Sequence, residues 1–204
     1  MVGPTSVGMI DRTSILPQLF ADPNDYLIIT GLAGAAKDAA SWTGDADNLL
    51  TFGGAMGGAL PTALGTALCA PNRNVLVITG DAELLMSAGA LATTASARPN
   101  NLTIVCIDNA QHGETGGQPS HTAMQTKLSL LAEGAGIPSV MTLSAPEKLE
   151  EACRFLKEKP GPRFLCVRVR PGPPSDYKRV WDLVHCRVRF KAAFISTEDG
   201  QTKR

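Results

Sequence analysis

The 204-residue sequence has few aromatic residues and no excess of charge of either sign. Phe, Trp and Tyr make up 5% of the chain, and 19 Lys and Arg residues balance 19 Asp and Glu residues. Sparse aromatics disfavour a platform for stacking nucleic-acid bases, and zero net charge disfavours attraction to phosphate backbones or membrane surfaces. The composition therefore predicts neither a nucleic-acid partner nor a membrane partner.

Patterns typical of disulfide frameworks, zinc sites and membrane spans are missing as well. The five cysteines form no C-x-x-C pair, and no basic, apolar secretory signal opens the sequence. We therefore expect reduced thiols in a cytoplasmic protein. The uncharged stretch Gly53–Ala70 is slightly shorter than the roughly 20 residues of a spanning helix. It also contains five glycines and a proline, which favour a closely packed helix over a span.

Short apolar runs alternate with segments of helical spacing along most of the chain. The alternation predicts an α/β fold, a doubly wound and mostly parallel sheet with helices on both faces. Asp176–Phe194 lies outside the alternation and is predicted to be a C-terminal helical extension. We expect one domain over 10–194, with flexible ends at 1–9 and 195–204. The predicted strands are Tyr26–Thr30, Leu49–Phe52, Val75–Thr79, Leu102–Ile107, Ser139–Leu143 and Arg163–Arg168. The other predicted helices are Ile10–Phe20, Met56–Cys69, Leu84–Ala97, Thr126–Gly134 and Pro146–Glu158.

Ligands of such sheets bind at the carboxyl ends of the strands, near the point where the strand order reverses. The loops after the strands are therefore the places to look for chemistry. Four of them are rich in glycine or polar residues: Gly31–Lys37, Gly53–Gly58, Gly80–Glu83 and Asp108–His121.

Two of these loops carry residues that suit a metal ion. Asp81 follows a buried strand, and alone it could simply be a helix N-cap. Asn109 follows the next predicted strand, so the two side chains face one crevice if the strands are neighbours. Their oxygens and the backbone carbonyl of Gln111 would form half of a hard oxygen shell. Magnesium prefers six such oxygens and often takes several from phosphates, so the remaining positions suit a diphosphate and a water.

The same residues resemble the motif of thiamine-diphosphate enzymes, which runs from Gly-Asp-Gly at one strand end to an Asn at a later one. Here it is Gly80-Asp81-Ala82 through Asn109, which follows Asp81 by 28 positions. Ala82 stands in place of the second glycine, and Glu83 stands where a serine is common. The run Gly113–Pro119 with Ser120-His121-Thr122 is most similar to sulfopyruvate decarboxylase β subunits and phosphonopyruvate decarboxylases.

The resemblance implies thiamine diphosphate and Mg²⁺ as cofactors, with Asp81, Asn109 and Gln111 as the metal ligands. It implies that the Gly54 carbonyl accepts from the cofactor's amino group and that Met56 bends the cofactor. His112 is a candidate contact for the diphosphate and His121 a candidate proton donor, which makes both candidate catalytic residues. The full set of expected cofactor-binding residues is Gly34, Gly54, Met56, Gly80, Asp81, Ala82, Glu83, Asn109, Gln111, His112 and Gly113.

The activity that the resemblance implies is a lyase reaction, the non-oxidative decarboxylation of a small 2-oxo acid that resembles sulfopyruvate or phosphonopyruvate. One α/β domain uses the whole chain, so we expect a separate pyrimidine-binding (α-type) subunit that supplies the activating glutamate, in a dimer or higher oligomer. A carboligase of the same family and a non-catalytic cofactor-binding subunit stay open as alternatives. An unrelated nicotinamide-binding domain is disfavoured, because the glycine fingerprint is incomplete.

Overall fold

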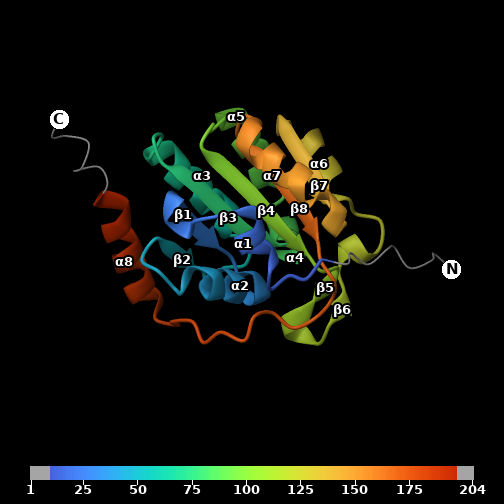
Figure 1. Cartoon of the computed structure of the whole chain (residues 1–204), viewed down its shortest axis with the longest axis horizontal. Coiled ribbons are helices and arrows are strands. Elements are labelled where there is room, and N and C mark those ends of the chain that lie inside the picture. Colours follow the sequence, from blue (N-terminus) through green and yellow to red (C-terminus); the bar gives the residue numbers. More distant parts are fainter. Residues whose placement is uncertain (1–9, 197–204) are drawn as a thin grey trace.

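The structure is a computed structural model that describes residues 10–196. Six parallel strands form one sheet in the order β2-β1-β3-β4-β8-β7, and helices cover both of its faces (Figure 1). This confirms the predicted doubly wound sheet. The ends that were expected to be flexible, 1–9 and 195–204, lie outside the described residues, except for positions 195 and 196.

The elements have the following bounds. The strands are β1 (Tyr26–Thr30), β2 (Leu49–Thr51), β3 (Asn74–Gly80), β4 (Leu102–Asp108), β5 (Gln111–His112), β6 (Gln118–Pro119), β7 (Ser139–Leu143) and β8 (Arg163–Arg168). The α-helices are α1 (Ile15–Leu19), α2 (Ala33–Thr43), α3 (Ala59–Cys69), α4 (Asp81–Met86), α5 (Gly89–Ala97), α6 (Leu128–Gly134), α7 (Leu149–Glu158) and α8 (Leu183–Ile195). Short 3-10 helices are η1 (Pro23–Asp25), η2 (Gly113–Thr115), η3 (His121–Ala123) and η4 (Pro146–Lys148).

The central strands are buried on both faces, as their unbroken apolar sequences predict. In β3, Val75 and Val77 pack into a core with α3, α5 and α6, whereas Leu76 and Ile78 pack into a second core with α1, α2 and α7. Successive side chains of a strand point to opposite faces, so one strand contributes to both cores. All four side chains are fully buried.

The strand order reverses between β1 and β3. The chain leaves β1 towards β2 at one side, then returns to β3 at the other side and continues to β4. Within β3 and β4, Gly80 lies opposite Ile107, so Asp81 and Asp108 leave the sheet at the same edge. The expected site therefore lies at the switch point of the sheet, where the ends of helices leave room for a ligand.

Several of the predicted boundaries are wrong. Helix α2 begins at Ala33, inside the segment Gly31–Lys37 that was predicted to be a loop. The predicted helix Leu84–Ala97 is two helices, because α4 begins directly at the strand end and stops at Met86 before a break ahead of Gly89, a residue with poor helix propensity. The predicted loop 108–121 also folds into the small hairpin of β5 and β6.

The C-terminal helix begins later than the predicted Asp176. Residues 171–182, here called the strap, have no regular structure, and α8 begins at Leu183. Asp182 caps the helix, since its side chain accepts a hydrogen bond of 3.0 Å from the backbone N–H of His185. The strap runs beside α2 and ends in α8 next to β2 (Figure 1). Within the described range, no helix is long and apolar enough to cross a membrane.

Candidate functional site

A cavity with a volume of about 610 Å³, called the larger cavity below, lies at the carboxyl edge of the sheet. Its walls come from the ends of β1, β3 and β4, the loop after β4, and the strap. Ten of the eleven expected cofactor-binding residues line it: Gly34, Met56, Gly80, Asp81, Ala82, Glu83, Asn109, Gln111, His112 and Gly113.

Two expected residues lie elsewhere. Gly54 is exposed in the turn after β2, and His121 is exposed at the start of η3; neither lines the cavity. The structure thus brings His112 to the cavity but leaves the candidate proton donor His121 outside it. The roles of both residues stay predictions.

Asp81 is the first residue of α4, and only 2% of its surface is exposed. Its Oδ2 accepts hydrogen bonds from the hydroxyls of Ser120 and, at 2.9 Å, Thr122. Both donors come from the end of the loop after β4, so this loop is tied to the end of β3. Both hydroxyls bind Oδ2, and neither binds the other carboxylate oxygen, Oδ1.

Thr122 links Asp81 to a second buried carboxylate. Its Oγ1 is 2.7 Å from Oδ1 of Asp108, which also forms an ion pair of 2.6 Å with Arg168 on the neighbouring strand. One hydroxyl proton cannot serve two carboxylates at once. The Thr122 hydroxyl is therefore shared between the two carboxyl groups. Burial raises the pKa of Asp81 above its ordinary value, and the nearby charge of Asp108 raises it further.

This charge distribution fits a bound cation. Asp81 and Asp108 carry two negative charges against the single positive charge of Arg168, so ionised Asp81 has no cationic partner of its own. Asn109 Oδ1 accepts one bond, of 3.2 Å from the Gln111 N–H, and keeps a second lone pair. Within residues 10–196, no group of three or more His, Cys, Asp or Glu side chains is arranged to hold a metal. A metal here would depend on amide and carbonyl oxygens besides Asp81, which are donors that Mg²⁺ accepts.

The turn after β4 is shaped by its own backbone. Ala110 adopts a left-handed conformation with φ of 59°, which a residue with a Cβ rarely takes. Its N–H donates to Asp108 Oδ1 at 3.1 Å, and its carbonyl accepts from the Ser120 N–H at 3.0 Å. The loop therefore closes on itself and sets Asn109 and Gln111 at the cavity.

A second tight turn lies at the end of β1, where Gly31 and Leu32 pack against the side chain of Glu83 from α4. The Glu83 side chain is buried, and its Oε2 accepts a hydrogen bond of 3.1 Å from the Leu32 N–H. A Cβ on Gly31 would lie 1.6 Å from the same oxygen, so only glycine fits. Burial raises the pKa of Glu83 above its ordinary value, while the Leu32 N–H opposes the rise. The Glu83 side chain thus holds the loop after β1, which lines the cavity, through the Leu32 N–H.

A buried ion pair holds the same loop from the other side. Arg12 Nε and Nη2 both lie 2.8 Å from Asp38 Oδ2. The guanidinium lies so close to Gly34 that a Cβ there would be 2.1 Å from Nη2. Asp38 Oδ1 accepts from the backbone N–H and hydroxyl of Ser175, at 2.8 Å and 3.0 Å. One carboxylate therefore joins the N-terminal segment, α2 and the strap.

The strap contributes residues that the sequence did not single out. Arg179 and Trp181 line the cavity, and the Arg179 Cζ lies 3.9 Å from the centre of the Trp181 ring. The segment was predicted to be helical, which would have placed these side chains on a helix instead. The signal that could have corrected this was Asp182, a residue type that favours the N-cap and marks a helix start after it.

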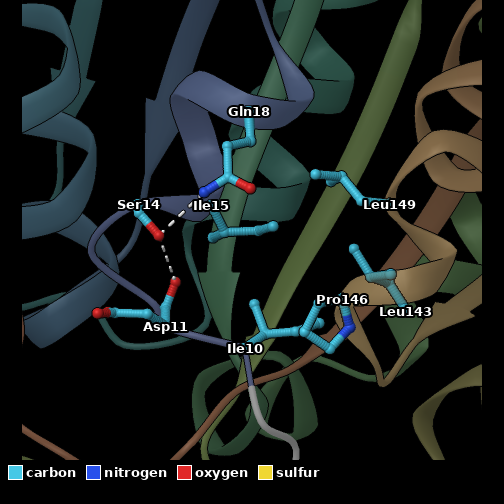
Figure 2. A pocket seen from close by; sticks show the side chains of 8 residues that line it. All are labelled: Ile10, Asp11, Ser14, Ile15, Gln18, Leu143, Pro146 and Leu149. Atoms are coloured by element: carbon cyan, nitrogen blue, oxygen red, sulfur yellow. Dashed lines mark hydrogen bonds between the residues drawn. The ribbon is translucent and has the colours of Figure 1, made fainter.

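A smaller cavity, of about 190 Å³, has fewer polar side chains in its lining. Figure 2 shows that its polar groups bond to one another: the Gln18 amide donates to Ser14, and the Ser14 hydroxyl donates to the Asp11 carbonyl. Most of the other lining side chains are aliphatic. The complete lining is Ile10, Asp11, Ser14, Ile15, Gln18, Leu143, Pro146 and Leu149.

Comparison with known families agrees with the geometry of the larger cavity. The model of the C-terminal TPP-binding domain of thiamine pyrophosphate enzymes matches residues 33–167. The chain belongs to this family. The matched range contains Asp81, Asn109 and every expected cofactor-binding residue, and it ends before the strap. The family predicted from the motif is thus confirmed.

Two curated relatives are similar to most of the chain. A sulfopyruvate decarboxylase subunit beta from Methanocaldococcus jannaschii is 32% identical over 148 residues, which cover 72% of this chain and 78% of that protein. A phosphonopyruvate decarboxylase from Streptomyces viridochromogenes is 30% identical over 199 residues, which cover 98% of this chain. The matched part is 48% of that second protein, so the chain spans about half of its length.

A solved structure supports the fold. The 2-oxoglutarate:ferredoxin oxidoreductase from Magnetococcus marinus superposes with a TM-score of 0.62 over 89% of this chain and 70% of its own. Its sequence is 17% identical, so the likeness concerns the arrangement of strands and helices alone.

Proposed function

We propose that this chain is the diphosphate-binding subunit of a two-chain, thiamine-diphosphate- and Mg²⁺-dependent enzyme that decarboxylates a small 2-oxo acid. The single observation that carries the proposal is the buried carboxylate of Asp81 at the switch point of the sheet, inside a cavity lined by the motif residues. The relatives named above are decarboxylases of sulfopyruvate and phosphonopyruvate. We therefore infer a substrate with a sulfonate or phosphonate group.

The residues of this chain would hold the cofactor by its charged end. Asp81, the Asn109 amide oxygen and the Gln111 carbonyl are the proposed ligands of Mg²⁺. At Gly80 a Cβ would meet nothing within 4 Å, so the backbone is open to close approach, and Met56 offers an apolar surface to the organic part. Gly34 lines the cavity beside Arg12. When bound, thiamine diphosphate supplies the carbon that attacks a 2-oxo acid and accepts the electron pair left behind by carbon dioxide.

The hydroxyls of Ser120 and Thr122 would keep Asp81 in one orientation. Because both bind Oδ2, they fix the side chain and leave Oδ1 as the oxygen for the metal. A bound cation favours the ionised carboxylate, so metal binding would oppose the rise in the pKa of Asp81 that burial causes. Within this proposal, Arg168 forms an ion pair with the neighbouring Asp108.

The need for a second chain is supported by exposed apolar side chains around the cavity. Met56, Met86 and Trp181 are 39%, 65% and 60% exposed. Met86 lies beside the turn that carries Met56, since its Cβ would be 3.3 Å from a Cβ on Gly57. Such side chains suit an interface with a pyrimidine-binding partner that supplies the activating glutamate, in a dimer or higher oligomer.

Calorimetry with thiamine diphosphate and Mg²⁺ tests the cofactor site. We expect Asp81→Ala to weaken binding about 100-fold or more, because a charge-assisted metal contact is lost without replacement. Asp47→Ala removes an exposed carboxylate and serves as the control. Equal affinity of Asp81→Ala and Asp47→Ala would refute the metal assignment.

The partner is tested separately by activity. The purified chain, saturated with thiamine diphosphate and Mg²⁺, should show no decarboxylation of sulfopyruvate or phosphonopyruvate until a pyrimidine-binding chain from the same host is added. Robust turnover by the chain alone would contradict the two-subunit proposal but not the cofactor site.

A further inference from the structure

The strap places Arg179 at the cavity, and the proposed function assigns no role to this arginine. Arg179 is 4% exposed and lines the same cavity as Asp81. Arginine is seldom buried to this extent without a carboxylate or another anion beside it. The contacts of each guanidinium nitrogen therefore decide whether Arg179 has such a partner.

Arg179 has no anionic partner among the described residues. Its Nε and Nη1 are buried and make no hydrogen bond there, and none of the ion pairs includes it. Of the carboxylates that act on its charge, Asp45 is bound by Arg189 and by the Val180 N–H, and Glu114 is exposed. The cavity's other buried arginine, Arg12, is paired with Asp38.

The position of Arg179 is held by its neighbours. The Val180 N–H donates to Asp45 Oδ2 at 2.7 Å, which fixes the backbone next to it. The Trp181 ring stacks against the guanidinium at 3.9 Å and stabilises its charge. The five N–H groups of a guanidinium lie in its plane, so stacking on one face leaves the donors at its edge available. Two of the nitrogens, Nε and Nη1, carry three of these N–H groups, and both are buried without a hydrogen-bond partner among the described residues. This arrangement costs free energy until an acceptor arrives.

The charges of the cavity are divided between its walls. The strand-end wall carries the carboxyl groups of Asp81 and Glu83 and suits a cation. The strap wall carries Arg179, and half-buried Lys37 lines the cavity as well. A ligand that combines a metal ion with oxyanion groups matches both walls at once.

We propose that Arg179 is an oxyanion receptor that binds a phosphate or phosphonate-type group of a ligand in the cavity. This inference rests on the proposed function only for its two possible sources of the oxyanion, the cofactor diphosphate and the acidic tail of the 2-oxo acid. The planar fork of arginine binds two oxygens of such a group at once, which lysine cannot do.

Binding to the full-length chain tests the receptor with two probes. Thiamine diphosphate with Mg²⁺ is one; 3-phosphonopropionate, compared with propionate, is the other and needs no cofactor or turnover. We expect Arg179→Gln to weaken at least one phosphorus-containing probe 10-fold or more, with propionate unchanged and Arg179→Lys intermediate. The probe that is weakened identifies the source. Arg187→Gln, an exposed arginine of α8, is the control, and thermal unfolding verifies that each variant is folded.

The outcomes separate this inference from the proposed function. If the wild-type chain fails to bind thiamine diphosphate but binds 3-phosphonopropionate through Arg179, the proposed function fails and the receptor stands. If folded Arg179→Gln binds both probes as Arg187→Gln does, Arg179 only packs against Trp181 and the inference is overturned. Failure of the wild-type chain to bind either probe overturns it as well.

Discussion

The two walls of the cavity are held in different ways. The strand-end wall is built from residues at the ends of β1, β3 and β4, and buried hydrogen bonds around Asp81 and Glu83 connect them. The strap wall has no regular structure and depends on contacts to α2 and the turn after it, through Asp38 and Asp45. One wall is thus fixed by the sheet itself, and the other by two carboxylates from outside it.

The difference indicates a division of labour. The family match covers the ends of β3 and β4 in the strand-end wall and stops before the strap. Residues that would bind the shared cofactor are therefore in the part that the sheet fixes. Residues that would distinguish one acid from another can change in the strap without altering the strand register. If so, substitutions at the two walls should differ in how far their effects spread.

The largest effect is expected at Asp38, where the strap joins the rest of the domain. Asp38→Ala leaves buried Arg12 without its partner and removes the acceptor for Ser175. Breaking a buried ion pair in this way costs about 3 to 5 kcal/mol of stability. Urea unfolding measures the loss, and amide exchange at the Ser175 N–H should become fast. If the strap wall were held by the sheet instead, its exchange would not change.

Asp47→Ala is the matched control for Asp38→Ala, since Asp47 is exposed in the turn that follows α2. It should change the free energy of unfolding by less than about 0.5 kcal/mol. Replacing Arg12 and Asp38 together by apolar residues of similar size should cost less than Asp38→Ala alone, because no uncompensated charge stays buried. An equal cost would mean that packing, and not charge, holds the strap.

A smaller effect is expected at Gly31, in the strand-end wall. In Gly31→Ala the new methyl group meets the Glu83 carboxylate, which has to move away from Leu32. Overpacking of this kind costs about 1 to 3 kcal/mol. In combination with Glu83→Ala the clash disappears, so the double variant should lose less stability than the two single losses together. Additive losses would show that the two positions are not in contact.

Gly65→Ala is the control for Gly31→Ala. Gly65 lies inside α3, and a Cβ there would meet nothing within 4 Å. The substitution should stabilise the chain by about 0.5 to 1 kcal/mol, because alanine favours the helix. The same chemical change would then have opposite signs at the two glycines, as the packing around each requires.

The strand-end wall could largely be predicted from the sequence. Val75–Thr79 and Leu102–Ile107 are unbroken apolar runs that end in Gly-Asp and Asp-Asn, and parallel strands bring such ends to one edge. The hydroxyls of Ser120 and Thr122 could not be placed, because their contacts to Asp81 depend on how the loop after β4 folds back. That fold depends on a left-handed Ala110, which no local sequence rule favours.

The strap wall could not be predicted. Arg179 lies in a stretch that the sequence predicts to be helical, and the hydrogen bonds of Ser175 to Asp38 and of Val180 to Asp45 hold this stretch along the cavity. Such contacts join residues that are far apart in the sequence, as with Asp45 and Val180. Periodicity reports on local structure and contains no information on these pairs.

The smallest effect is a pH dependence that Glu83 gives to the strand-end wall. Burial raises its pKa in the folded chain, whereas the unfolded chain ionises near the ordinary value of 4.5. Below that value both states are protonated and the wall is at its most stable; stability then falls as pH rises through the raised pKa of the folded state. In metal-free buffer, Glu83→Gln should remove this fall, so its stability relative to wild type should increase with pH across this window. Exposed Glu133→Gln should follow wild type at every pH. A parallel pH profile for wild type and Glu83→Gln would mean that Glu83 ionises normally, and that the strand-end wall carries this charge at no cost to the fold.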